Sequence, residues 1–260
     1  MASWIFLRGL TRETAHWGRF PADFQRALPD SRVIALDLPG NGQLHQVASP
    51  LAIEKMVADC RSELERRGHK PPYCLLAMSL GAMVAAEWSC SAPQEVACCV
   101  LINTSLRPFS PFYRRLQPRN YLPLLGLALR SGTSRQVEQT ILQLTSNAAE
   151  AREGVLADWV AARLQHPVRA ANALRQLLAA ARYRARREPP ATAVLLLASE
   201  QDRLVHVDCS RAIAASWHCP LALHPSAGHD LPLDDPQWVI DQVRQWLASR
   251  SRLSGMDMKV

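Results

Sequence analysis

The sequence lacks several features that would assign it to a particular class of protein. No uncharged apolar stretch approaches the roughly 18 residues that a membrane span needs. The seven cysteines form no C-x-x-C pair, and no paired histidines stand at a ligand spacing, so no structural metal is expected. The phosphate-binding pattern G-x-x-x-x-G-K-[ST] is missing, as is any recognised nucleic-acid-binding motif. These absences argue against a membrane-spanning, metal-dependent, nucleotide-binding or nucleic-acid-binding protein, and no cofactor is expected.

The composition is that of an ordinary globular protein. Hydrophobic residues make up 48% of the 260 residues and charged residues 20%, enough to bury one full core. An odd number of cysteines, with Cys74, Cys98 and Cys99 in apolar runs, favours reduced core thiols and a cytoplasmic location. The first eight residues have no basic lead or small-residue cleavage site, so they predict a strand rather than a signal peptide.

Short apolar runs of strand length recur along the chain. Six strands are predicted, at residues 4–7, 33–36, 73–76, 96–102, 194–197 and 221–223. Helical periodicity fills the intervals: one helix is expected after Ser49, its cap, with Pro50 in its first turn, and another after residues 235–236. Strands that alternate with helices form a parallel sheet covered on both faces. The predicted fold class is therefore α/β, with a mostly parallel sheet flanked by helices.

The alternation fails once, between residues 105 and 190, where only helical spacing is found. One apolar stripe in this segment consists of Leu174, Leu177, Leu178 and Ala181. An insertion between two parallel strands can fold over the carboxyl edge of the sheet, where ligands bind. We therefore predict a core of residues 1–104 and 191–250, an inserted helical cap of residues 105–190 and a flexible tail of residues 251–260.

Residues 77–81, Ala-Met-Ser-Leu-Gly, lie between an apolar run and a run of small residues. A strand that stops at a serine and turns directly into a helix presents the hydroxyl as a nucleophile. Only small residues fit at the positions two before and two after the serine, because the backbones of the strand and the helix nearly touch there. Gly81 meets this demand, and Ala77 adds one methyl where glycine is usual. The alternative is that Ser79 is an ordinary helix cap.

A serine hydroxyl needs a base to remove its proton, and the base needs an acid to orient it. Asp202 follows a buried strand and a short turn, so it is the candidate acid, with Glu200 as the fallback. His229 follows the last strand and is the candidate base. Asp230 is rejected as the acid, because an immediate neighbour cannot easily reach the ring of its own histidine.

Acyl transfer also needs donors for a developing oxyanion. The backbone N–H of Leu80, directly after the serine, is one candidate, and the N–H of Leu10, after the first strand, is the other. Four further residues are predicted to support these loops or line a pocket: Arg8, Gly9, Trp17 and Met78. The remaining histidines are interpreted as structural or solvated.

Together these features resemble the α/β-hydrolase superfamily. The resemblance rests on the loop at residues 8–10, the loop at residues 37–42, the serine turn, Asp202 and residues 228–229, in that order along almost the whole chain. Within the superfamily, the helical cap most resembles small carboxylesterases of the pimeloyl-acyl-carrier-protein methyl ester esterase type. Two departures are Ala77 for glycine and Arg8 where histidine is usual.

The resemblance implies a serine hydrolase that cleaves a carboxylic ester or thioester through an acyl-enzyme, with Ser79, His229 and Asp202 as the triad. The cap leucines would shape a pocket for a medium-length acyl group: Leu122, Leu124, Leu125, Leu127 and Leu129. An acyltransferase or a cofactor-free haloperoxidase-like enzyme would use the same site. A non-catalytic binding protein on the same scaffold is the alternative of another class.

The net charge of +7 is unevenly distributed. The segment from residue 105 to residue 190 holds 14 Arg, no Lys and 5 acidic residues, a net +9 that leaves −2 for the rest. A solvated helix face is the simpler interpretation. The alternative is a docking surface for an acidic partner, such as acyl carrier protein or a coenzyme A phosphate. The arginines in question are Arg114, Arg115, Arg119, Arg182, Arg184, Arg186 and Arg187.

Overall fold

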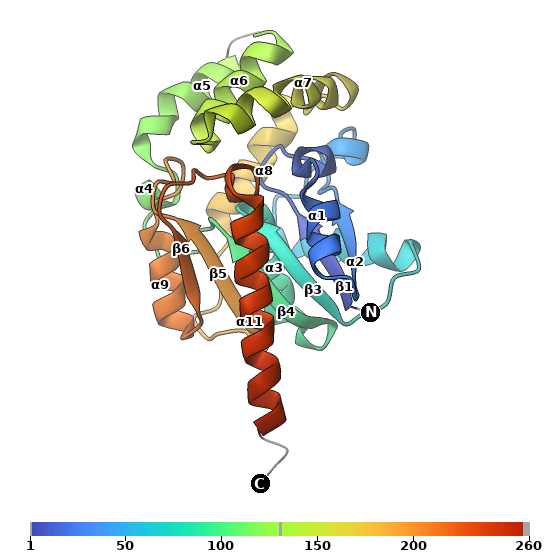
Figure 1. Cartoon of the computed structure of the whole chain (residues 1–260). Coiled ribbons are helices and arrows are strands. Elements are labelled where there is room, and N and C mark those ends of the chain that lie inside the picture. The colour runs from blue at the N-terminus through green and yellow to red at the C-terminus, as the bar shows by residue number, and fades with distance from the viewer. Residues whose placement is uncertain (1, 130–131, 257–260) are drawn as a thin grey trace.

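A six-stranded parallel sheet forms the centre of the computed structural model, which describes residues 2–129 and 132–256 (Figure 1). The strand order is β2-β1-β3-β4-β5-β6. The strands are β1 (Ala2–Leu7), β2 (Ser31–Leu36), β3 (Tyr73–Met78), β4 (Val96–Ile102), β5 (Ala193–Ser199) and β6 (Leu221–His224). All five neighbouring pairs are parallel. The α/β sheet expected from the apolar runs is confirmed.

Helices cover both faces of the sheet. On one face, α1 (Phe20–Ala27) packs against Trp4 and Phe6 of β1, and α11 (Pro236–Met256) belongs to the same apolar cluster. On the other face, α2 (Ile53–Arg66), α3 (Leu80–Ser91) and α9 (Asp208–Trp217) pack on the alternate residues of the same strands. Successive side chains of a strand point to opposite faces of the sheet, so alternate residues pack against different helices. The result is two separate apolar clusters, one on each face.

The direction in which successive strands are added to the sheet reverses between β1 and β3. From β1 the chain crosses outward to β2, and from β3 it crosses the other way to β4. In open parallel sheets, the crevice at the carboxyl end of such a point is where ligands bind. The loop after β1 and the turn after β3 both open there, and the serine turn is part of the second.

Between β4 and β5 the described chain is helical and lies over the carboxyl ends of the strands (Figure 1). Its helices are α4 (Phe112–Arg115), α5 (Tyr121–Leu129), α6 (Ser134–Thr145), α7 (Ala149–Gln165) and α8 (Ala170–Arg182). Five short helical elements occur elsewhere in the described chain or between these helices: η1 (Thr14–Trp17), η2 (Gly42–Leu44), η3 (Pro93–Glu95), η4 (Pro118–Asn120) and α10 (Leu231–Asp234). Among the described residues, no helix has both the length and the apolar character of a membrane span.

The buried face of α8 is polar, which corrects the leucine stripe expected from its sequence. Leu174 and Leu177 are 56% and 45% exposed, whereas Asn172 and Gln176 are buried. Gln176 accepts from Thr11 N and donates toward Asn41 Oδ1 and Pro39 O, and Asn172 bonds three backbone groups of residues 45–49. Irregular loops need partners for their backbone groups, and the two amides supply them.

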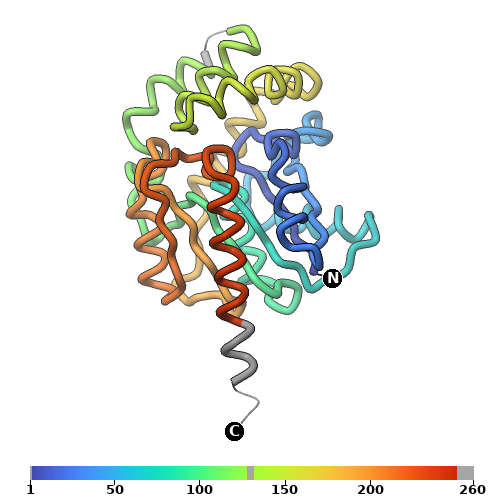
Figure 2. The backbone as a smooth tube through the Cα atoms, in the orientation of Figure 1, coloured from blue at the N-terminus to red at the C-terminus, as the bar shows by residue number. Residues whose placement is uncertain are grey.

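One expectation about a helix end is also corrected. Ser49 does not cap α2, which begins at Ile53 after Ala52; instead Ser49 is buried and its Oγ donates to Pro39 O over 2.7 Å. At the other end of the chain, α11 runs from Pro236 to Met256 and so extends into the segment expected to be a flexible tail; its earlier part is the red helix of Figure 2. Residues 257–260 of the expected tail lie outside the described residues.

The serine turn is packed as tightly as its sequence requires. Ser79 has φ 54° and ψ −114°, a backbone conformation that few side-chain-bearing residues adopt. A Cβ on Gly81 would lie 2.5 Å from Leu7 O and 2.6 Å from Arg8 O, both backbone atoms of β1 and its loop. Ala77, in contrast, is fully buried within β3 without departing from the strand. The glycine at 81 is therefore demanded sterically, whereas the alanine at 77 is accommodated.

We predict opposite effects of adding a methyl group at two helical glycines. Gly81→Ala should lower the free energy of unfolding by about 3 kcal/mol or more, because backbone atoms cannot make room. Gly154→Ala, on the exposed side of α7 with nothing within 4 Å, should raise it by about 0.5–1 kcal/mol. Urea denaturation of both variants measures this; a Gly81→Ala protein as stable as the native one would contradict the packing described.

Candidate active site

Ser79 stands at the carboxyl end of β3, where α3 begins, and it is partly exposed. Its backbone N–H donates to Ile102 O over 3.0 Å, and its carbonyl accepts from Thr104 Oγ1 over 3.0 Å. Both partners belong to the end of β4 and the residues that follow it. The serine turn is therefore fixed to the neighbouring strand, and its hydroxyl side faces the crevice edge of the sheet.

His229, after β6, and Asp202, after β5, form a buried pair at the same edge of the sheet. His229 Nδ1 lies 2.7 Å from Asp202 Oδ2, and the two residues are 3% and 7% exposed. The other carboxylate oxygen of Asp202 accepts from Leu204 N and Val205 N, at 2.8 and 3.0 Å. Because a carboxylate only accepts, the imidazole hydrogen lies on Nδ1. The lone pair of Nε2 is then free to take a proton.

No hydrogen bond joins Ser79 Oγ to His229 in this structure, but one residue connects their supports. Asn103 follows Ile102 directly, has φ 43°, and donates through Nδ2 to His229 O over 2.8 Å. Its Oδ1 accepts from Ser199 N, at the end of β5, over 2.8 Å. The same short segment therefore holds the serine turn on one side and the histidine loop on the other. Sequence analysis missed Asn103; the available signal was a polar residue directly after a fully buried strand.

Two backbone N–H groups close to Ser79 are without partners among the described residues. Leu80 N is the first amide of α3, so it has no acceptor within the helix, and Leu10 N donates to no described group. A Cβ on Gly9 would lie 3.1 Å from Ser79 Cβ and 3.6 Å from Ser79 Oγ, so the loop that carries Leu10 passes directly beside the serine. The N-terminus of α3 also favours negative charge.

Arg8 is held in a bidentate ion pair with Asp230, the residue after His229. Nη1 donates to Oδ1 over 3.0 Å and Nη2 to Oδ2 over 2.6 Å, and both side chains are 3% exposed. The guanidinium lies over the ring of Trp17, 4.7 Å from its centroid, and Nη1 also contacts Met78 Sδ at 3.5 Å. Arg8 thus contacts both Trp17 and Met78, and all three side chains are buried.

The cap is attached to the histidine loop at the end of α6. Asp230 N donates to Thr145 O over 2.7 Å, and Asp234 accepts from both Gly228 N and Asn147 N. A Cβ on Gly228 would lie only 2.7 Å from Thr145 O. Close backbone contact at this point explains the glycine before His229. The loop that carries His229 is therefore covered by the cap.

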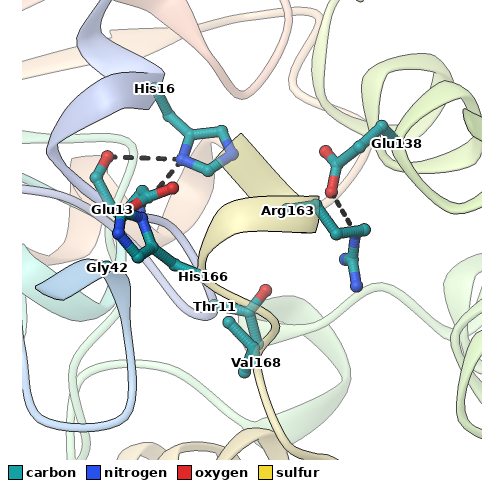
Figure 3. A pocket seen from close by; sticks show the side chains of 8 residues that line it. All are labelled: Thr11, Glu13, His16, Gly42, Glu138, Arg163, His166 and Val168. Atoms are coloured by element: carbon teal, nitrogen blue, oxygen red, sulfur yellow. Dashed lines mark hydrogen bonds and ion pairs between the residues drawn. The ribbon is translucent and has the colours of Figure 1, made fainter. Parts of the chain in front are cut away.

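A second contact between cap and core surrounds a small cavity beside the loop that follows β1 (Figure 3). Glu138 of α6 accepts from Arg12 and from Arg163 of α7, and His166 Nδ1 lies 2.8 Å from Glu13 Oε2. Burial holds the pKa of His16, on the wall of this cavity, well below its usual value. The cavity measures about 10 Å³, room for one water molecule and not for a substrate.

Two of the five cap leucines expected to shape an acyl pocket lie on the outside of the cap. Leu122 and Leu125 are 80% and 53% exposed, so they face away from the core. Leu124 and Leu127 are half-buried, and the side chain of Leu129 lies outside the described residues. In the described part of the chain, no group of three or more His, Cys, Asp or Glu residues could hold a metal ion.

The seven arginines expected to dock a partner fall into two sets. Arg114 pairs with Asp208 at 3.2 Å, Arg115 donates to Ala180 O over 2.7 Å, and Arg119 donates to the side chain of Gln117. These three are bonded to the protein itself. The second set is exposed at the end of α8 and just beyond it: Arg182, Arg184, Arg186 and Arg187.

Residues 4–242 match a family model described as the alpha/beta hydrolase family. The chain belongs to this family. The superfamily expected from the motifs is therefore confirmed, and so is its fold. No curated protein matches the sequence.

Solved structures of other α/β-hydrolases have the same fold. A protein described as a non-heme bromoperoxidase from Mycobacterium tuberculosis matches with a TM-score of 0.76 at 21% identity, over 96% of this chain and 92% of its own. The enol-lactonase of Burkholderia xenovorans matches with a TM-score of 0.77 at 15% identity, over 95% and 91%. A thermophilic esterase of Thermogutta terrifontis gives 0.72 at 20% identity, over 96% and 90%. Identities this low show a shared fold only.

We predict that removing one partner of the Arg8–Asp230 pair in this hydrolase costs more than removing both. Arg8→Met or Asp230→Leu alone should lower the free energy of unfolding by about 3–5 kcal/mol, because a buried charge is left unpaired. The double variant should recover most of the lost stability. Its two loops are no longer held at a fixed distance, so turnover should remain at least about tenfold below that of the native protein. Chemical denaturation and steady-state kinetics measure the two quantities.

The exposed Arg26–Asp23 pair of α1 is the matched control, with side chains 71% and 30% exposed. Arg26→Met and Asp23→Leu should each change stability by less than about 1 kcal/mol and leave turnover unchanged. Native stability in either single variant of the buried pair, or native turnover in its double variant, would be inconsistent with a positioning role.

Proposed function

We propose that this α/β-hydrolase is a serine hydrolase that cleaves a carboxylic ester or thioester through an acyl-enzyme. The observation that carries the proposal is the buried His229–Asp202 hydrogen bond of 2.7 Å, at the same sheet edge as the strained serine turn. A histidine oriented by a carboxylate, with a partly exposed serine at the same sheet edge, is the set of groups that can activate a hydroxyl.

In the first half-reaction, Ser79 Oγ attacks the substrate carbonyl carbon while His229 Nε2 accepts the hydroxyl proton. The carbonyl oxygen becomes an oxyanion, to which the N–H groups of Leu10 and Leu80 donate. Asp202 keeps the imidazole oriented and stabilises its positive charge. When the carbon–oxygen or carbon–sulfur bond breaks, His229 returns the proton to the leaving alcohol or thiol.

In the second half-reaction, water replaces the leaving group. His229 takes a proton from the water as it attacks the acyl carbon, and the second tetrahedral intermediate uses the same two amides. Collapse of this intermediate releases the carboxylic acid and returns the proton to Ser79. We also propose a cytoplasmic setting, which the seven free cysteines support.

We predict that a fluorophosphonate probe labels the protein covalently and that Ser79→Ala abolishes the labelling. Ser91→Ala, at an exposed serine at the end of α3, is the matched control and should label as the native protein does. Gel fluorescence and mass spectrometry of the labelled peptide provide the measurement. A native protein that the probe leaves unlabelled would indicate a binding protein on this scaffold instead.

Turnover should also depend on the His229–Asp202 pair. Asp202→Asn should lower kcat on p-nitrophenyl esters by about 10⁴-fold, because the amide favours the wrong imidazole tautomer. A series of esters of increasing acyl length identifies the preferred substrate. If Glu200→Gln, at the fallback acid, lowers kcat as much as Asp202→Asn does, the assignment of the acid is wrong.

A further inference from the structure

An apolar helix of the cap is left uncovered. The sequence of α5 is YLPLLGLAL, without a charged residue, and none of residues 121–127 is buried. Tyr121, Leu122 and Leu125 are 38%, 80% and 53% exposed. A helix that is apolar all round is normally buried in a protein core or in a membrane. Here it lies at the outer side of the cap, away from the sheet (Figure 1).

The exposed apolar surface extends to the helix before it. Phe112 and Tyr113 of α4 are 74% and 49% exposed and pack edge-to-face on each other, 5.7 Å between centroids. We call the five side chains of residues 112–125 the apolar face: Phe112, Tyr113, Tyr121, Leu122 and Leu125. They are half of the ten large apolar side chains that are exposed in the described structure, so these side chains are concentrated in one short segment of the chain.

Arginines lie beside the apolar face at its α4 end, and the face itself carries no carboxylate. The segment from residue 105 to residue 137 contains six Arg and no Asp or Glu. The end of α8 brings further arginines next to α4. Arg115 donates to Ala180 O and Arg107 to Ala181 O, and the backbones of Arg107 and Arg184 form a β-bridge. The basic rim consists of Arg107, Arg119, Arg182 and Arg184, all exposed.

Two acidic residues at the margin of this surface are already bonded. Asp208 lies 3.2 Å from Arg114 and 3.1 Å from Arg211. Glu87 accepts a hydrogen bond from the hydroxyl of Tyr183 over 3.1 Å. The outward charge of the rim is therefore positive. A partner that covers the apolar face must be apolar at its centre and anionic at its edge.

We propose that the apolar face and the basic rim dock this protein onto an anionic lipid surface. The described side chains of α5 offer one polar atom, the hydroxyl of Tyr121, so a protein partner would find almost no directional contacts there. A bilayer needs none: the apolar side chains enter the boundary between headgroups and acyl chains, and the guanidinium groups meet the lipid phosphates. This surface binding is independent of the proposed hydrolysis and would bring the cap, not the sheet, to the lipid.

Co-sedimentation of the full-length protein with vesicles tests the proposal. We expect binding to vesicles of phosphatidylcholine with phosphatidylglycerol and much weaker binding to phosphatidylcholine alone. Leu122→Ser with Leu125→Ser should lower the partition coefficient by about a hundredfold. Arg182→Gln with Arg184→Gln should lower it by about tenfold or more. Turnover of a soluble p-nitrophenyl ester should be unchanged in both variants, which checks that they are folded.

Matched control variants carry the same changes elsewhere. Leu164→Ser with Leu174→Ser alters leucines 67% and 56% exposed on α7 and α8, and Arg26→Gln with Arg66→Gln alters exposed arginines of the core. Both controls should bind vesicles as the native protein does.

The proposal is overturned if the native protein binds neither kind of vesicle, or if the controls lose as much binding as the paired variants. It is also overturned if the apolar face instead retains a soluble acidic carrier protein. The Ser79→Ala variant should bind vesicles normally, so a failure of lipid binding is distinguishable from a failure of the proposed hydrolysis.

Discussion

A buried ion pair between Arg8 and Asp230 joins the two loops on which the candidate chemistry depends. One loop carries the amide of Leu10, and the other carries His229. Two parallel N–H···O bonds fix an angle as well as a distance, so the loops cannot shift separately. Such a pair adds little net stability, but separating its charges in a dry interior is costly. It therefore acts as a constraint on geometry, at the position where the superfamily usually has histidine.

The parallel sheet supplies the remaining constraints. Because all six strands end at one edge, the serine turn after β3 and the histidine loop after β6 can be held by the segment after β4. Ile102 O accepts from Ser79, and Asn103 donates to the carbonyl of His229. The cap then closes over this edge through Thr145 and Asp230. Each candidate group is thus positioned by backbone contacts that its own loop could not make alone.

The features that sequence predicts well are local ones. A strand's apolar run and the glycine demanded at 81 are visible within a few residues, so the sheet, its order of elements and the serine turn were predictable. The Arg8–Asp230 pair joins residues 222 positions apart, and no local pattern indicates it. The buried face of α8 was mispredicted for a related reason. Gln176 is buried because distant loops need its amide, which overrides the apolar stripe.

The central proposal is that Ser79 carries the acyl group as a covalent acyl-enzyme intermediate. Rapid-quench mass spectrometry of the protein mixed with a p-nitrophenyl ester tests it most directly, with the release of p-nitrophenol followed in parallel. The account predicts a burst of p-nitrophenol and a mass increase of one acyl group on the peptide that contains residues 77–81. Steady turnover without an adduct, or an adduct on another residue such as a cysteine, would contradict it.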